Sequence, residues 1–178
     1  MMNTWLRQNK VAMWLLTVLR FYVGFQWIHG GWGKLTGGFD ATGFLTNAIT
    51  LSTGDKPVVK AAWAGFLQHF ALPNVELFNI LVPVGEFLVG LGLILGTFTT
   101  VAALMGMVMN FAFLFSGTIS TNPYLILLEI FIVVAGANAG RIGLDRWVLP
   151  YLKAHVFKRH PKHDGGTPTA PAPDHRAA

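Results

Sequence analysis

The sequence predicts an all-α integral membrane protein, in which four spanning helices form a bundle with an amphipathic outer loop between spans one and two. Hydrophobic residues make up 53% of the 178 residues and charged residues only 12%, a composition typical of membrane proteins. Four apolar stretches approach the roughly 20 residues that a transmembrane helix needs. Their residues are apolar on all helical faces, which argues against a set of buried helices in a water-exposed bundle.

The four stretches predict spans at about residues 11–29, 77–96, 99–116 and 123–140. With their connections they form one membrane domain, residues 1–150. Residues 151–178 are expected to form a basic interfacial segment and a disordered tail, because the last part is rich in Pro, Ala, Gly and His and has little to bury.

The start of the first span superficially resembles a signal peptide, because Arg7 and Lys10 precede an apolar run. Arg20 interrupts that run, and the run ends in Gln26-Trp27-Ile28-His29 instead of a small-residue cleavage site. We therefore expect an uncleaved first span.

The long connection between the first two spans, residues 30–76, begins with glycines at 30, 31, 33, 37 and 38. Glycine allows a backbone to turn tightly or to approach a ligand. Two short helices are predicted next, one from Asp40 to Ile49 and one that begins at Pro57 and is ended by Pro73. Their Trp and Phe residues fit a membrane interface, so we expect this loop to lie flat over the outer mouth of the bundle.

Basic residues predict the orientation. Seven of the thirteen Lys and Arg residues lie from Arg141 onward, and Arg7 and Lys10 precede the first span. The positive-inside rule then places both termini in the cytoplasm of a multi-pass protein of the cell membrane. Because the cations gather at these ends, we interpret the net charge of +5 as a topology signal, and we expect no nucleic-acid partner.

The chain has no cysteine, which excludes disulfides, thiolate nucleophiles, cysteine-ligated zinc and iron–sulfur clusters formed by this chain. Redox chemistry would need a bound cofactor, a diffusible quinone or another subunit. A bis-histidine haem would require His29 and His69 to converge from a span end and a loop. We therefore expect no metal and no haem.

Four polar residues lie within the spans: Arg20, Glu86, Asn110 and Glu129. At a rise of about 1.5 Å per residue, Arg20 and Glu86 are each roughly 14 Å from a span end and near the bilayer midplane. Charged groups at this depth are costly, so we expect the four residues to form one cluster. If Arg20 pairs with one carboxylate, the other can exchange protons, which makes Arg20, Glu86 and Glu129 candidate catalytic residues. The alternative is a structural lock, with Asn110 as an interhelical tie.

A second group follows at the end of the first span. Arg20, Gly24, Trp27 and Gly31 fall on one helical face, so a slot beside Gly24, walled by Trp27, would take a flat ring, while Lys34 would attract an anionic donor. The alternative for the tryptophans is an aromatic belt at the membrane interface. The predicted substrate or quinone-binding residues are Gly24, Trp27, His29, Lys34 and Asn110.

Three motifs indicate a family. Arg20 leads into Gly30-Gly31-Trp32-Gly33-Lys34-Leu35, Gly85-Glu86 precedes Gly90-Leu-Gly-Leu-Ile-Leu-Gly96, and Ala135-Gly-Ala-Asn-Ala-Gly-Arg-Ile-Gly-Leu-Asp145 follows the last span. Over roughly residues 10–150 the chain resembles the DoxX/DoxD family of small bacterial and archaeal membrane proteins. The DoxD branch is similar to the large subunit of thiosulfate:quinone oxidoreductase. Carried over by position, Arg20, Lys34 and Glu86 are the family-like polar residues.

The resemblance implies a membrane-embedded redox subunit that passes electrons from a small, thiosulfate-like donor to a membrane quinone. Its expected partners are the lipid bilayer, the quinone, and a second redox subunit or further copies of the chain. Two alternatives stay open. One is a non-catalytic scaffold that recruits a soluble partner through the basic C-terminal segment, and the other is a small transporter with Arg20 as an anion site.

Overall fold

The computed structural model describes residues 1–155, and over this range the regular structure is entirely helical. The all-α prediction is therefore confirmed. Helices α2 (Lys10–Gly37) and α5 (Val75–Leu95) are each long and apolar enough to cross a membrane. Helix α6 (Thr99–Phe115) and helix α7 (Asn122–Ala135), which continues into the 3-10 turn η2 (Gly136–Asn138), are shorter apolar helices. The expected disordered tail lies outside the described residues.

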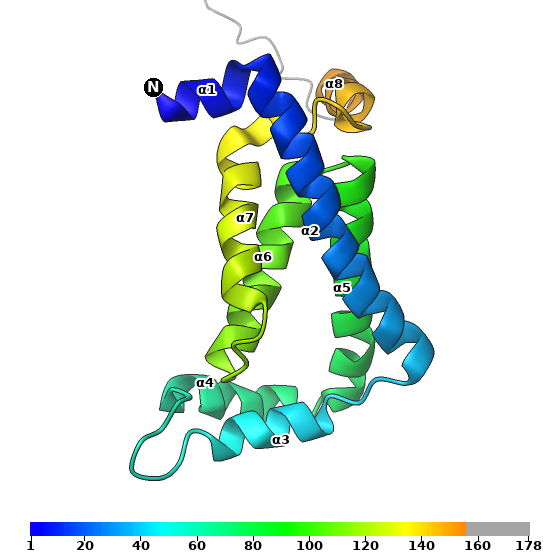
Figure 1. Cartoon of the computed structure of the whole chain (residues 1–178). Coiled ribbons are helices and arrows are strands. Elements are labelled where there is room, and N and C mark those ends of the chain that lie inside the picture. The colour runs from blue at the N-terminus through cyan, green and yellow to red at the C-terminus, as the bar shows by residue number, and fades with distance from the viewer. Residues whose placement is uncertain (156–178) are drawn as a thin grey trace, which may run out of the picture.

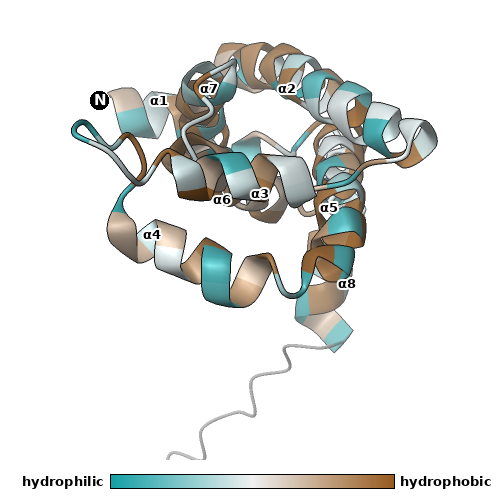
Figure 2. Cartoon of the chain, turned by 90° about the horizontal axis from the view of Figure 1, so that it is seen from below, coloured by the Kyte–Doolittle hydropathy of each residue, from teal (hydrophilic) through white to brown (hydrophobic). Residues whose placement is uncertain are grey.

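The long helices associate as two pairs, α2 with α5 and α6 with α7. The pairs meet at one end, beside helices α1 (Met2–Gln8) and α8 (Asp145–His155), and diverge toward the other (Figure 1). Helix α3 (Thr42–Thr50) and helix α4 (Ala61–Phe66), with the π-helical turn η1 (Leu67–Ala71), lie across that wider end (Figure 2). We call the segment from Ala41 to Ala71 the end layer.

The outward faces of the four long helices expose large apolar side chains. A water-soluble bundle would carry charges there, whereas helices in contact with lipid carry residues of this kind. The exposed residues include Val18, Phe21 and Phe25 of α2, Ile80, Val84 and Leu88 of α5, Leu104, Val108 and Phe111 of α6, and Leu127, Ile130 and Phe131 of α7.

Helix α2 is two turns longer than the predicted first span. The glycines at 30, 31, 33 and 37, which we expected in an irregular loop, are helical, and the helix ends at Gly38, whose φ of 76° is in the left-handed region. At the other end Asn9 caps α2 by accepting a hydrogen bond from the Val11 N–H at 2.7 Å. Apolar and aromatic neighbours continue the helical pattern through the glycines, so their low intrinsic propensity does not end the helix.

Glycines allow α2 and α5 to pack backbone to backbone. A Cβ on Gly31 would lie 2.6 Å from the Phe87 nitrogen, and one on Gly90 would lie 2.6 Å from the Ile28 nitrogen. Gly24 is similarly constrained, because a Cβ there would lie 3.0 Å from the Gly90 carbonyl oxygen. Small residues at such positions permit close approach of membrane helices. The α2–α5 pair is therefore a tightly packed unit.

The end layer has its own small core, in which Ala41, Leu45, Ala48, Leu67 and Ala71 are buried. Two polar contacts join it to the bundle. Trp63 Nε1 donates to Ser116 Oγ at 2.9 Å, and the Ala41 N–H donates to Asn79 Oδ1 at 2.7 Å. These contacts hold the layer over the wide end of the bundle.

Candidate functional site

A cavity of about 1050 Å³ lies between the helix pairs and the end layer. This volume is at the upper end of the roughly 300–1,000 Å³ found for small-molecule sites. Most of its lining is apolar and comes from α5, α6 and the aromatic residues of the end layer. The lining also includes five residues with polar side-chain groups near the middle of the bundle: Gln26, Trp27, Lys34, Glu86 and Asn110. An apolar chamber with a few converging polar groups is the usual form of a ligand site.

Lys34 and Glu86 form an ion pair at the cavity wall. Lys34 Nζ lies 2.8 Å from Glu86 Oε1 and 2.6 Å from Glu86 Oε2. The Glu86 side chain is only 4% exposed and that of Lys34 is 32% exposed. Gly30, one turn before Lys34, leaves room for the carboxylate, since a Cβ there would lie 3.4 Å from Glu86 Oε2. Each charge therefore offsets the cost of burying the other.

The second polar group joins three helices. Glu129 of α7 is fully buried. Its Oε1 accepts a hydrogen bond from Trp27 Nε1 of α2 at 2.7 Å, and its Oε2 accepts one from Asn110 Nδ2 of α6 at 3.0 Å. Gly106 faces the carboxylate, and a Cβ at that position would collide with it. We call Trp27, Asn110 and Glu129 the central triad.

Arg20 lies in a third place, at the narrow end of the bundle. The side chain is 1% exposed, and its guanidinium donates to the carbonyl oxygens of Ala139 at 3.4 Å and Ile142 at 2.6 Å. Gly96 and Gly143 pack directly against the guanidinium. Arg20 therefore fastens α2 to the chain between η2 and α8.

Residues 15–118 match the sequence model of a protein family described as DoxX. The chain belongs to the DoxX family. The match covers more than half of the 178 residues and confirms the family predicted from the motifs. No curated protein and no solved structure matches the chain.

The matched segment of this DoxX-family protein contains five polar residues of the cavity wall, Gln26, Trp27, Lys34, Glu86 and Asn110. It extends from α2 to the turn after α6 and so includes Arg20 as well. Glu129 lies beyond the match, on α7. The third member of the central triad is therefore supplied by the part of the chain outside the family match.

The expectation that Arg20, Glu86, Asn110 and Glu129 form one cluster is wrong. Only Asn110 and Glu129 are in contact, and Arg20 forms an ion pair with neither glutamate. The error lies in the depth estimate. Arg20 packs against Gly96 at the end of α5, and Glu86 is ten positions earlier in that helix, about 15 Å away along its axis.

The expected ring-binding slot beside Gly24 is filled by α5. A Cβ on Gly24 would lie 2.9 Å from Ile94 and 3.1 Å from Leu93, because the glycine face packs against a helix. Trp27, on the same face, does reach the cavity. His29 is exposed on the outside of α2, near Phe25. Of the predicted binding residues, the cavity thus receives Trp27, Lys34 and Asn110, and not Gly24 or His29.

Asp145 is a structural residue that the sequence reasoning did not single out. Its carboxylate accepts hydrogen bonds from the Phe98 N–H at 2.6 Å and the Thr99 N–H at 2.9 Å. It thereby caps the first turn of α6 from a distant part of the chain. Because the cap is not local in sequence, the usual signal of Asp just before an apolar run is missing.

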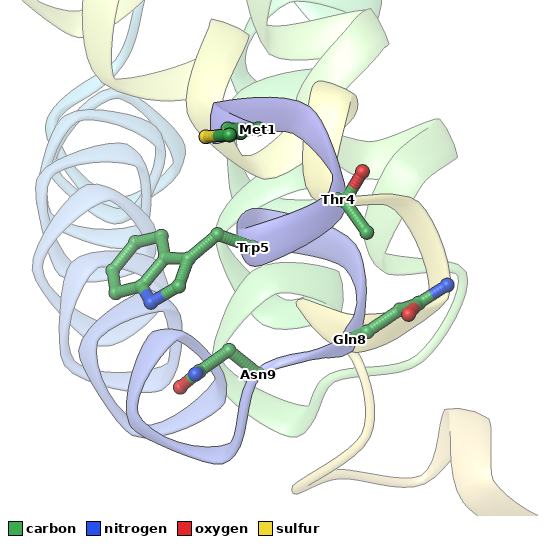
Figure 3. A pocket seen from close by; sticks show the side chains of 5 residues that line it. All are labelled: Met1, Thr4, Trp5, Gln8 and Asn9. Carbon is green, nitrogen blue, oxygen red and sulfur yellow. The ribbon is translucent and has the colours of Figure 1, made fainter.

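A smaller hollow lies on the surface at α1, lined by Met1, Thr4, Trp5, Gln8 and Asn9. Figure 3 shows these side chains spread along one short helix and its end, well apart from one another. The hollow is remote from the central triad and from the Lys34–Glu86 pair. We therefore assign the candidate site to the cavity within the bundle.

Proposed function

We propose that α2, α5, α6 and α7 all cross the bilayer, with both termini in the cytoplasm. The apolar outward faces of the four helices support this. The narrow end carries α1 and α8 with Arg7, Arg141, Arg146 and Lys153, and basic residues are typical of the cytoplasmic side. The end layer would then lie at the outer interface.

We propose further that this DoxX-family protein binds a lipid-soluble quinone in its cavity, as the quinone-reducing subunit of a membrane redox system. The observation that carries the proposal is an apolar chamber of about 1050 Å³ between helices with lipid-type outer faces, with polar groups on its wall. A quinone has the matching construction, a flat ring with two polar oxygens and an apolar tail. The ring would lie beside Trp27 and Asn110, and the tail along α5 and α6.

The reaction proposed from the family resemblance is a two-electron transfer. Two thiosulfate ions joining to form tetrathionate would release two electrons, and the quinone would take up these electrons and two protons to become a quinol. Lys34 is already paired with Glu86, so it attracts an anionic donor much less than an unpaired lysine would. The proposal therefore assigns donor oxidation to a second redox subunit.

Filling the cavity tests this function. Ala112 of α6 lines the cavity, so Ala112→Phe would occupy space that the ring or tail needs. Leu127→Phe, on the outward face of α7, is the matched control. We expect purified wild-type protein and Leu127→Phe to bind a decyl-substituted benzoquinone in calorimetry, and Ala112→Phe to lose at least about tenfold in affinity. Equal binding by the two variants, or none by the wild type, would refute the proposal.

A further inference from the structure

The central triad has one polar atom without a partner. Asn110 is 1% exposed and lines the cavity, its Nδ2 is bonded to Glu129, and its Oδ1 has no hydrogen-bond partner among the described residues. A buried acceptor left unpaired is costly. The cavity is the space from which a donor could reach it.

The orientation of the Asn110 amide depends on Glu129. Trp27 Nε1 can only donate, so Glu129 Oε1 always acts as its acceptor. A proton on Glu129 must then reside on Oε2, the oxygen that faces Asn110. An ionised Glu129 requires a donor from Asn110, whereas a protonated Glu129 requires an acceptor.

We propose that Asn110 contacts the head group of the bound ligand and that the protonation state of Glu129 decides which form of the ligand Asn110 favours. With Glu129 ionised, Asn110 Nδ2 faces the carboxylate and Oδ1 faces the cavity, where it accepts a hydrogen bond from a quinol hydroxyl. When Glu129 takes up a proton from the medium, its Oε2–H donates to Asn110 Oδ1 after a half turn of the amide. Nδ2 then faces the cavity and donates to a quinone carbonyl.

This inference rests on the proposed quinone site and adds a rule of selectivity to it. Asn110 is the ligand-contacting residue, and Glu129 is a positioning residue that acts through it. Quinone binding is accompanied by proton uptake and quinol binding by proton release. Protons therefore enter and leave through a residue one step away from the ligand.

Among the described residues, Glu129 is buried and its carboxylate accepts hydrogen bonds from Trp27 and Asn110. Helix α6 has no titratable residue, and the titratable groups on the other elements packed against α7 are engaged elsewhere or exposed. Among the described residues, Arg20 and Arg7 donate to backbone carbonyl oxygens, and Lys34 is paired with Glu86. Tyr22 packs edge-on against Tyr124. Lys10 and His29 are exposed.

The test measures affinity for both redox forms of one probe against pH. A decyl-substituted benzoquinone and its quinol are titrated anaerobically into the full-length protein between about pH 5 and pH 8. The proposal expects quinone affinity to rise as the pH falls and quinol affinity to rise with pH, each by up to about tenfold per pH unit. If both forms bind with pH-independent affinity, the inference is overturned while the quinone site stands. If neither form binds, the proposed function itself fails.

Two variants separate the roles. Glu129→Gln can only present its amide N–H to Asn110, so it should favour the quinone at every pH and abolish the pH dependence. Asn110→Leu should weaken both forms about five- to tenfold and remove the discrimination. Glu76→Gln, which alters an exposed carboxylate in the first turn of α5 outside the cavity lining, is the control and should keep the pH dependence. The thermal midpoint of Glu129→Gln verifies that this variant is folded. If folded Glu129→Gln binds both forms with the wild-type pH profile, the role assigned to Glu129 is wrong.

Discussion

The guanidinium of Arg20 donates a hydrogen bond of 2.6 Å to the carbonyl oxygen of Ile142, 122 positions further along the chain. The end of a helix leaves carbonyl groups without N–H partners, and Arg20 supplies donors to such groups near the end of η2. A charge that was expected to bind a ligand thus joins the first long helix to the last turn of the bundle.

Replacement of Arg20 should therefore reduce stability before it affects binding. Arg20→Leu removes two charge-assisted hydrogen bonds and should lower the unfolding free energy by about 2–4 kcal/mol. Arg141→Leu, which changes an exposed cation nearby, is the control. Thermal unfolding in detergent would measure both. Equal midpoints for the two variants would show that the buried contacts contribute nothing.

The glycine contact between α2 and α5 predicts opposite effects of two alanine substitutions. Gly90→Ala would place a Cβ 2.6 Å from the Ile28 nitrogen and should cost about 1–3 kcal/mol through overpacking. Gly33→Ala, in α2 with nothing within 4 Å of the added carbon, should be neutral or stabilising by up to about 1 kcal/mol. If the thermal midpoint falls in both variants, or in neither, the close approach of α2 and α5 at Gly90 is contradicted.

The Lys34–Glu86 pair predicts that two substitutions are better tolerated than one. Lys34→Met leaves Glu86 as a buried charge without its cation, and should cost about 1–2 kcal/mol because Lys34 is partly exposed. Lys34→Met combined with Glu86→Gln removes both charges and should recover part of that loss. A double-mutant cycle of unfolding free energies gives the coupling, and additive losses would exclude a significant pair.

Asp40, which directly precedes the end layer, predicts that the stability of the protein depends on pH. Hydrogen bonds from the backbone N–H and then the hydroxyl of Thr42 lower the pKa of this carboxyl below its ordinary 3.8. The native state therefore binds its proton less readily than the unfolded state, so this contribution is complete above the ordinary pKa and is lost as the pH falls through the lowered one. Asp40→Ala should destabilise the protein at neutral pH, and its difference from wild type should shrink in acid.

Asp55→Ala, in an exposed part of the same connection, is the control for Asp40. Acid titration followed by circular dichroism would compare the two variants with the wild type. A gap between Asp40→Ala and wild type that stays constant down to acid pH would show that the Thr42 bonds do not stabilise the ionised carboxyl.

The cap on α6 predicts a long-range effect of a single carboxylate. Asp145→Ala removes the acceptor for the Phe98 and Thr99 N–H groups and should cost about 1–2 kcal/mol. Asp145→Asn keeps one acceptor oxygen and should cost less. Unfolding midpoints equal to wild type for both variants would contradict the cap.

The helical class and the family could be predicted because they depend on local pattern. Apolar runs identify helices wherever they lie, and the motifs around Lys34 and Glu86 carry the family. The axial register of α2 against α5 could not be read in this way. The register depends on glycines of both helices that pack face to face. This contact places Arg20 beside Gly96, ten residues after Glu86 along the chain.

Part of the central triad could have been predicted more sharply. Asn110 and Glu129 were grouped by depth, and they are in contact. Trp27 was assigned to a slot beside Gly24, although an indole N–H near a buried carboxylate is itself a signal of a hydrogen bond. The missing information was which helices are neighbours, and the sequence alone did not provide it.

The narrow end of the bundle is fastened by Arg20 and Asp145, whereas the wide end is joined mainly through the end layer. We therefore expect the two helix pairs to be stiffer at the narrow end than at the wide end. A change in the splay of the pairs at the wide end would let the proposed cavity site take ligands of different bulk, while the Arg20 and Asp145 contacts at the narrow end stay in place. Spin labels placed on α5 and α6 near that end would report such a change as a shift in their separation.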